Sequence, residues 1–153
     1  MTYNNKKLFK LFQTVDDPSA QTIDENYTEV TGSKCQIVTT SSSPNIVYKF
    51  QFYARDTSTK QMLMHVKLQK SNDNLDIDDC NFNISGDENT SGDRYEHTVS
   101  TLFILENFDS SYLRIMVRSY SSSYESILHR SSDYDGSSTT TIYYNPSLIV
   151  LEV

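Results

Sequence analysis

Period-two alternation of apolar and polar side chains is the feature that most constrains the fold of this chain. Residues 46–52 alternate strictly, with Ile46, Tyr48, Phe50 and Phe52 on one face and Val47, Lys49 and Gln51 on the other. The same alternation recurs in 61–70 and in 111–120. Because successive side chains of a strand point to opposite faces of a sheet, these segments are predicted to be half-buried antiparallel strands.

Turn-type clusters rich in Ser, Asn and Asp separate these segments from further strand candidates. The candidates lie at 27–31, 34–40, 80–85, 97–105, 125–130, 139–144 and 147–153. About ten short strands with little or no helix indicate an all-β fold, an antiparallel β-sandwich or a barrel. Residues 5–13 carry a stripe that also fits a helix, but a strand or an extended arm is favoured there. We therefore expect an N-terminal arm or edge strand over 1–18 and a single β-sandwich domain over 19–153.

The composition indicates a folded, acidic domain. Only 37% of the residues are hydrophobic, but eleven Tyr and seven Phe supply large buried surfaces that disordered chains lack. The net charge of −7 argues against nucleic acid and membrane as partners, because both require a basic footprint. No run reaches the ~18 apolar residues of a membrane span, and the first residues lack a signal-peptide cleavage site. We therefore expect synthesis in the cytosol.

Residue types that carry chemistry are present but not in the spacing that a site requires. Acidic residues cluster in two loops, at Asp73, Asp76, Asp78 and Asp79 and at Asp133 and Asp135. Neither cluster has the spacing of an EF-hand, so solvated loops are expected, with a weak calcium site as the alternative. The three histidines stand apart, and there is no nucleophile elbow or phosphate loop. We expect no cofactor and no enzymatic activity, and a hydrolase is the third and weakest possibility.

The two cysteines, Cys35 and Cys80, lie in strand-like runs without a metal-binding spacing. Free, partly buried thiols are expected in a cytosol-made protein, and their pairing is left open.

Tyrosines in a Ser-rich context are the candidate ligand-facing residues. They are Tyr120, Tyr124, Tyr143 and Tyr144. Tyr beside Ser supplies rigid contact area and adaptable hydrogen bonding, which suits a glycan or a protein partner. Tyrosines at a sheet edge or at a subunit contact are the alternative.

Apolar residues on the solvent-facing sides of the predicted strands indicate self-association, provided that they lie together on one sheet. The candidate interface comprises Val47, Leu63, Met116, Leu148 and Val150. The closing segment 147–153 is apolar on both faces. We expect Ile149, Leu151 and Val153 to face the core, while Leu148 and Val150 meet another subunit.

The segment 20–54, "AQTIDENYTEVTGSKCQIVTTSSSPNIVYKFQFYA", resembles a module of small virion proteins from tailed, marine cyanophage-like bacteriophages. The residues that carry this resemblance are Ile23, Asp24, Glu29, Val30, Gly32 and Ser33. The second half, from Tyr95 to Val153, is similar in layout to the trimeric jelly rolls of the tumour-necrosis-factor and C1q type. The resemblance implies a jelly-roll β-sandwich that assembles as a homotrimer.

The same resemblance implies a place in the virion after synthesis in the host cytoplasm. The part would be a capsid decoration protein, a fibre or knob, or a tail appendage, with the major capsid protein or a tail or fibre protein as partner. An N-terminal docking arm would comprise Lys6, Lys7, Leu8, Phe9, Lys10, Leu11 and Phe12. The alternative function is a receptor- or glycan-binding tip that uses the four tyrosines.

Overall fold

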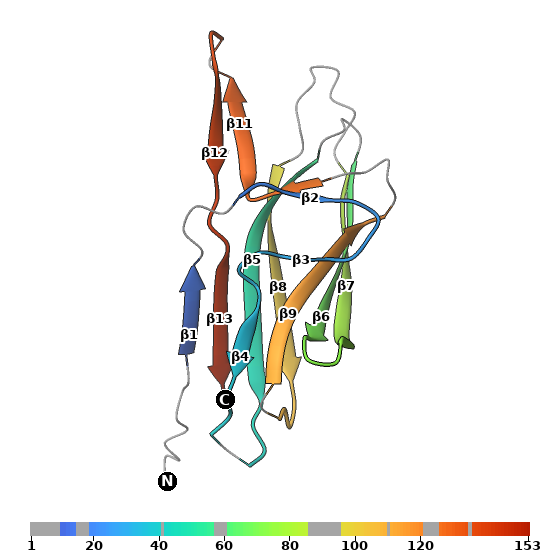
Figure 1. Cartoon of the computed structure of the whole chain (residues 1–153), viewed down its shortest axis with the longest axis vertical. Coiled ribbons are helices and arrows are strands. Elements are labelled where there is room, and N and C mark those ends of the chain that lie inside the picture. Colours follow the sequence, from blue (N-terminus) through green and yellow to red (C-terminus); the bar gives the residue numbers. More distant parts are fainter. Residues whose placement is uncertain are drawn as a thin grey trace.

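The alternating segments form the long strands of two packed antiparallel sheets in a computed structural model of the chain (Figure 1). The structure describes residues 10–14, 19–40, 42–56, 61–85, 96–109, 111–120, 126–134 and 136–153. Side chains are described for 19–40, 42–55, 63–78, 96–109, 111–120, 126–131 and 136–153. These residues contain thirteen strands and no helix, so the prediction of an all-β antiparallel β-sandwich is confirmed. The jelly-roll topology stays a prediction.

The first layer, here called the β5 sheet, is built around the long strand β5 (Ile46–Asp56). Its other strands are β1 (Lys10–Thr14), β13 (Ser147–Glu152), β10 (Ser126–Leu128), β2 (Gln21–Ile23) and β8 (Glu96–Leu105). One side of β5 pairs with β13 and then with β10, while its other side pairs with β8 along ten residues.

The second layer, here called the β9 sheet, is built around β9 (Ser111–Ser119). Its other strands are β6 (Gln61–Lys70), β7 (Leu75–Ser85), β3 (Thr28–Glu29) and β4 (Cys35–Ile37). The remaining two strands, β11 (Arg130–Tyr134) and β12 (Thr139–Tyr143), pair only with each other among the described residues. This β11–β12 ribbon projects beyond the sandwich at the end opposite the C-terminus (Figure 1).

Strand boundaries differ from the sequence prediction where turns are unusually short. β7 begins at Leu75, inside the stretch that was expected to be a turn, because four residues are enough to close the β6–β7 hairpin. Asn74 takes a φ of 56° there, and Asp73 accepts a hydrogen bond from the Leu75 N–H at 3.2 Å. The predicted strand 125–130 is divided by His129, whose φ of 62° separates β10 from β11.

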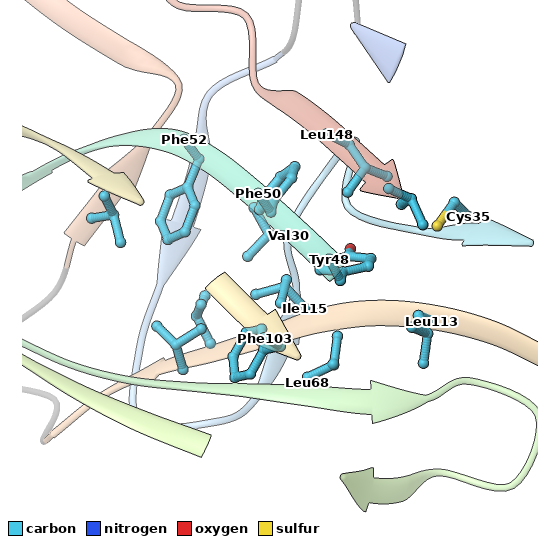
Figure 2. Packing of buried hydrophobic residues seen from close by; sticks show 14 of the residues in the cluster. Val30, Cys35, Tyr48, Phe50, Phe52, Leu68, Phe103, Leu113, Ile115 and Leu148 are labelled. Atoms are coloured by element: carbon cyan, nitrogen blue, oxygen red, sulfur yellow. The ribbon is translucent and has the colours of Figure 1, made fainter. Parts of the chain in front are cut away.

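The core lies between the two sheets and follows the predicted alternation. Tyr48, Phe50 and Phe52 point from β5 toward β9, where Leu113 and Ile115 face them (Figure 2). All five side chains are at most 1% exposed. The inward faces of β5 and β9 and the inward residues Met64, Val66 and Leu68 of β6 are therefore confirmed.

Ser33 connects the two layers through polar contacts inside this core. Its carbonyl oxygen accepts a hydrogen bond from the Tyr48 hydroxyl of the β5 sheet, and its hydroxyl accepts one from the Ile115 N–H at 3.0 Å. Burial raises the pKa of Tyr48 well above its ordinary value. Because buried polar groups are costly unless they are paired, these contacts fix the alignment of the two sheets.

The facing of the C-terminal strand is the main error of the sequence prediction. Leu148 and Val150 are fully buried in the core, whereas Ile149 and Leu151 point to the outside. The register explains the inversion, because Leu148 pairs with Phe50 and Val150 pairs with Tyr48. Directly opposite residues share a face of the sheet, so the inward side chains of β5 draw these two residues inward.

Glu152 completes the inward face of β13 and is only 5% exposed. Its two carboxylate oxygens accept hydrogen bonds from the Thr40 N–H at 3.1 and 3.0 Å, and one accepts from the Thr40 hydroxyl at 3.0 Å. This carboxylate therefore fastens the loop after β4 to the last strand of the chain.

Replacing Glu152 with glutamine should lower the free energy of unfolding by about 1–2 kcal/mol, because charge-assisted hydrogen bonds are weakened in a buried place. Urea denaturation followed by circular dichroism measures the change. Glu106→Gln, at an exposed position, is the matched control and should be nearly neutral. Equal midpoints for the two variants would contradict the role assigned to Glu152.

Candidate functional site

The outward face of the β5 sheet carries two adjacent rows of apolar side chains. In the first row, Val47 pairs with Leu151 on one side and with Ile104 on the other. In the second row, Lys49 pairs with Ile149 and with Leu102. Since directly opposite residues share a face, the three strands present one continuous surface. We call Val47, Leu102, Ile104, Ile149 and Leu151 the outer β5 face.

The outer β5 face is open to solvent at its β8 side. Leu102 is 60% exposed and Ile104 is 64% exposed, while the other three members are half-buried. Lys49 is the one charged residue in the two rows, and neither row contains a carboxylate. Monomeric proteins rarely expose contiguous apolar surface, so this face has the character of an association surface.

The structure does not gather the five predicted interface residues on one face. Val47 belongs to the outer β5 face, but Leu63 and Met116 are half-buried on strands of the β9 sheet. Leu148 and Val150 are covered completely by their own chain. The sequence prediction placed Leu148 and Val150 on the outward face because the odd- and even-numbered residues of β13 are both largely apolar.

The projecting β11–β12 ribbon is the second exposed feature. Every residue of β12 is exposed, including Ile142 at 38% and Tyr143 at 49%. At its base, the Tyr144 ring stacks on the Tyr53 ring with 4.1 Å between centroids, and the Tyr144 N–H donates to the His129 carbonyl at 2.9 Å. Because β residues alternate, Ile142 lies on the same side as Tyr144, and Tyr143 points away.

A second contact at the ribbon base is polar. The Ser131 hydroxyl donates to the Glu96 carboxylate at 2.7 Å, which links β11 to the start of β8. Burial raises the pKa of the neighbouring Tyr53 hydroxyl above its ordinary value, and the Glu96 carboxylate adds to this effect. Together with the tyrosine stack, this bond anchors the ribbon while leaving its outer length uncovered.

The predicted tyrosines fall on different parts of the molecule. Tyr143 and Tyr144 lie on and next to the ribbon, whereas Tyr120 follows β9 of the other sheet and is 71% exposed. Tyr124 lies outside the described residues. The sequence prediction missed Tyr53, although the alternation of β5 assigns it to the outward face.

Part of the predicted docking arm is a strand. Residues Lys10, Leu11 and Phe12 belong to β1, which pairs with β13 at the border of the β5 sheet. One side of their backbone is therefore paired with their own chain. Lys6, Lys7, Leu8 and Phe9 lie outside the described residues.

The outward face of the β9 sheet carries a cationic cluster around Tyr27. The Lys67 ammonium lies 3.7 Å from the Tyr27 ring centroid and 2.8 Å from the Asp76 carboxylate. The Tyr27 hydroxyl is hydrogen-bonded to His65, and the Arg118 guanidinium lies 5.2 Å from the same ring. These contacts border a hollow of about 350 Å³, also lined by Asp78 and Ile77.

Most charges of this cluster are already paired within the sheet. A hydrogen bond from Lys67 lowers the pKa of Asp76 below its ordinary value. Arg114 forms an ion pair with Glu29 at 3.0 Å and donates a hydrogen bond to the side-chain oxygen Oε1 of Gln69 at 2.6 Å. The arrangement is that of a solvated sheet surface cross-linked by polar contacts.

The remaining candidates for chemistry have structural partners. Asp73 caps the β6–β7 turn and Asp76 is paired with Lys67, while the side chains of Asp79, Asp133 and Asp135 lie outside the description. Across the described ranges, no three His, Cys, Asp or Glu side chains stand close enough to share a metal ion. Cys35 is a buried free thiol, and burial raises its pKa to about 12. The described segments include no helix suited to crossing a membrane.

The fold and its exposed faces define an all-β sandwich protein with an apolar sheet face and a projecting ribbon. No protein-family model and no curated protein matches the chain. Among solved structures, it is similar to one described as the structure of infectious bursal disease virus, Gx strain, with a TM-score of 0.43 and 8% identity. The match covers 95% of this chain and 37% of that one. A likeness of this strength carries no argument about function.

Proposed function

We propose that this chain is a non-enzymatic structural subunit that self-associates through the outer β5 face. The observation that carries the proposal is the pair of apolar rows on an open sheet surface, with Leu102 and Ile104 more than half exposed. Burying apolar surface is favourable by roughly 25 cal/mol per Å², so covering this face favours association.

The charge distribution is compatible with a second copy as the occupant of this face. Each chain carries a net charge of −7, so two copies repel each other over most of their surfaces. The outer β5 face contains no carboxylate and only Lys49 among its paired rows. Copies can therefore meet there with less repulsion than elsewhere, and a closed homo-oligomer removes the face from solvent.

The proposed setting is the virion of a tailed bacteriophage. It is supported by the sequence resemblance of segment 20–54 and by the jelly-roll layout of the second half. In this proposal the subunit is a homotrimer made in the host cytoplasm. It decorates the capsid or belongs to a fibre or knob, and its partners are the major capsid protein or a tail or fibre protein.

The native mass of the purified chain tests the proposal, and we expect an oligomer. The double variant Leu102→Glu with Ile104→Glu should dissociate into monomers, because it places two carboxylates on each apolar face that the oligomer buries. Light scattering after size exclusion measures the mass, and circular dichroism checks that the sheets persist. The matched control is Leu75→Glu. Leu75 lies on the β9 sheet and is 54% exposed, so this variant should leave the oligomer intact.

A wild-type monomer at tens of micromolar would overturn the proposal. So would a double variant that keeps the native mass of the wild type. The alternative function, a glycan- or receptor-binding tip, requires the tyrosines of the ribbon to be free, and the experiment in the next subsection separates it.

A further inference from the structure

We infer that the β11–β12 ribbon of one copy lies across the outer β5 face of the next copy. This inference rests on the proposed self-association and names the surface that covers the face. The contact joins two different surfaces, the ribbon and the sheet face, so it is a head-to-tail contact.

The first argument is the energetics of the ribbon. An isolated two-stranded hairpin is at best marginally stable in water, because ordering each residue costs about 1–2 kcal/mol. In the part of the chain whose side chains are described, the body contacts the ribbon at its base, through the Tyr53–Tyr144 stack and the Ser131–Glu96 hydrogen bond. The whole of β12 is exposed. Covering the Tyr143 side of β12 by another copy supplies the burial that the ribbon lacks on its own.

The second argument is the match of surface chemistry. The segment 139–145, "TTTIYYN", contains no charged residue. The outer β5 face offers aliphatic side chains around a single lysine, and tyrosine rings pack well against such side chains and can receive a cation on their face. The register pairs Asp133 of β11 with Thr140, on the Ile142 side of the ribbon, so the paired residues on the Tyr143 side include no carboxylate. Two chains of net charge −7 approach each other most easily through that side.

The third argument is geometric. The ribbon continues away from the sandwich, while the Val47–Leu151 row lies near the opposite end of β13, beside the C-terminus (Figure 1). A chain therefore cannot lay its ribbon over its own face without leaving the tyrosine stack. The five residues of β12 extend about 17 Å, enough to cross three strands whose outer axes are about 10 Å apart.

The head-to-tail form has a consequence for the assembly. A contact between two different surfaces closes into a ring when its rotation allows and otherwise continues as a filament. The proposed homotrimer is the closed case, in which every ribbon and every face is used once. No free apolar face then remains on the particle.

A cross-linking experiment on the full-length chain tests the contact directly. A photo-reactive benzoylphenylalanine replaces Tyr143, and the isotopically labelled and unlabelled chains are mixed before illumination. We expect mixed-isotope cross-links from position 143 to peptides that contain Leu102–Ile104 or Ile149–Leu151. Cross-links confined to the β9 sheet of the other copy would overturn the inference.

A variant pair supplies the energetic test. Tyr143→Ser should raise the dissociation constant of the oligomer at least about tenfold, since each factor of ten corresponds to about 1.4 kcal/mol. Tyr120→Ser, next to the other sheet, removes a ring that is more exposed than Tyr143 and should leave the dissociation constant unchanged.

The outcomes separate the two proposals. A monomeric wild type rejects self-association itself. An oligomer that the Leu102 and Ile104 variants dissociate, but that the ribbon variant leaves intact, keeps the proposed function and rejects the ribbon contact. A ribbon variant that stays oligomeric and loses binding on a glycan array also rejects the contact and favours the tip function.

Discussion

Phe50→Ala should destabilise the protein by about 3–5 kcal/mol, the range for removing a fully buried phenylalanine. The Phe50 side chain is completely buried and stacks on Phe52 with 5.7 Å between ring centroids. It belongs to the hydrophobic core between the two sheets (Figure 2). The cavity that remains cannot collapse easily, because Leu148 and Thr101 are held beside it by the strand registers.

Urea denaturation of the variant measures this loss against Lys34→Ala, at an exposed position outside the outer β5 face. The lysine variant should change the free energy of unfolding by less than about 0.5 kcal/mol. A loss below about 1 kcal/mol for Phe50→Ala would contradict the packing of the core.

Lowering the pH from 7 to 5 should remove about 2 kcal/mol of stability through His129 alone. The side chain is fully buried, and burial lowers its pKa to about 4, below the ordinary value of 6.5. Between pH 6.5 and pH 4 the unfolded chain therefore binds a proton at this histidine while the folded chain does not. The free energy of unfolding consequently decreases as the pH is lowered through that interval. Each pH unit in this window contributes about 1.4 kcal/mol.

His129→Phe isolates this effect because it keeps a ring beside Phe52, whose centroid lies 6.5 Å from the imidazole centroid. The difference in unfolding free energy between wild type and variant should change with pH between 7 and 5, and the variant should have the smaller slope. Proton NMR of the wild type gives a second reading, in which the His129 ring should not titrate above pH 5. Titration near pH 6.5 would contradict the assignment.

His129 also explains how the ribbon leaves the sandwich. Its N–H donates to the Tyr53 carbonyl at 2.9 Å and its carbonyl accepts from the Tyr144 N–H at 2.9 Å, so its backbone joins β5 to the base of the ribbon. Neither ring nitrogen has a hydrogen-bond partner among the described residues. Nothing in the local sequence distinguishes this histidine from the other two, because its burial comes from strands distant in the chain.

The candidate site was predictable only in part. Val47, Tyr143 and Tyr144 were identified from alternation and from their neighbours. Leu102 and Ile104 were missed because the end of β8, "LFIL", is apolar at every position and has no alternation to read. The ribbon was missed as a separate unit because its two strands look like any other hairpin in the sequence.

By itself, the sequence determined the fold class and the faces of the strands that alternate. Tyr48, Phe50 and Phe52 had to face one side and Val47 and Lys49 the other, since the backbone geometry of a strand allows no alternative. Only the tertiary structure decided which face of β13 is buried, where β10 ends, and which strands form the outer β5 face. Strand pairing depends on contacts between residues far apart in the chain. Because β13 is apolar on both faces, its own sequence does not determine which face is buried, and the register with β5 decides it.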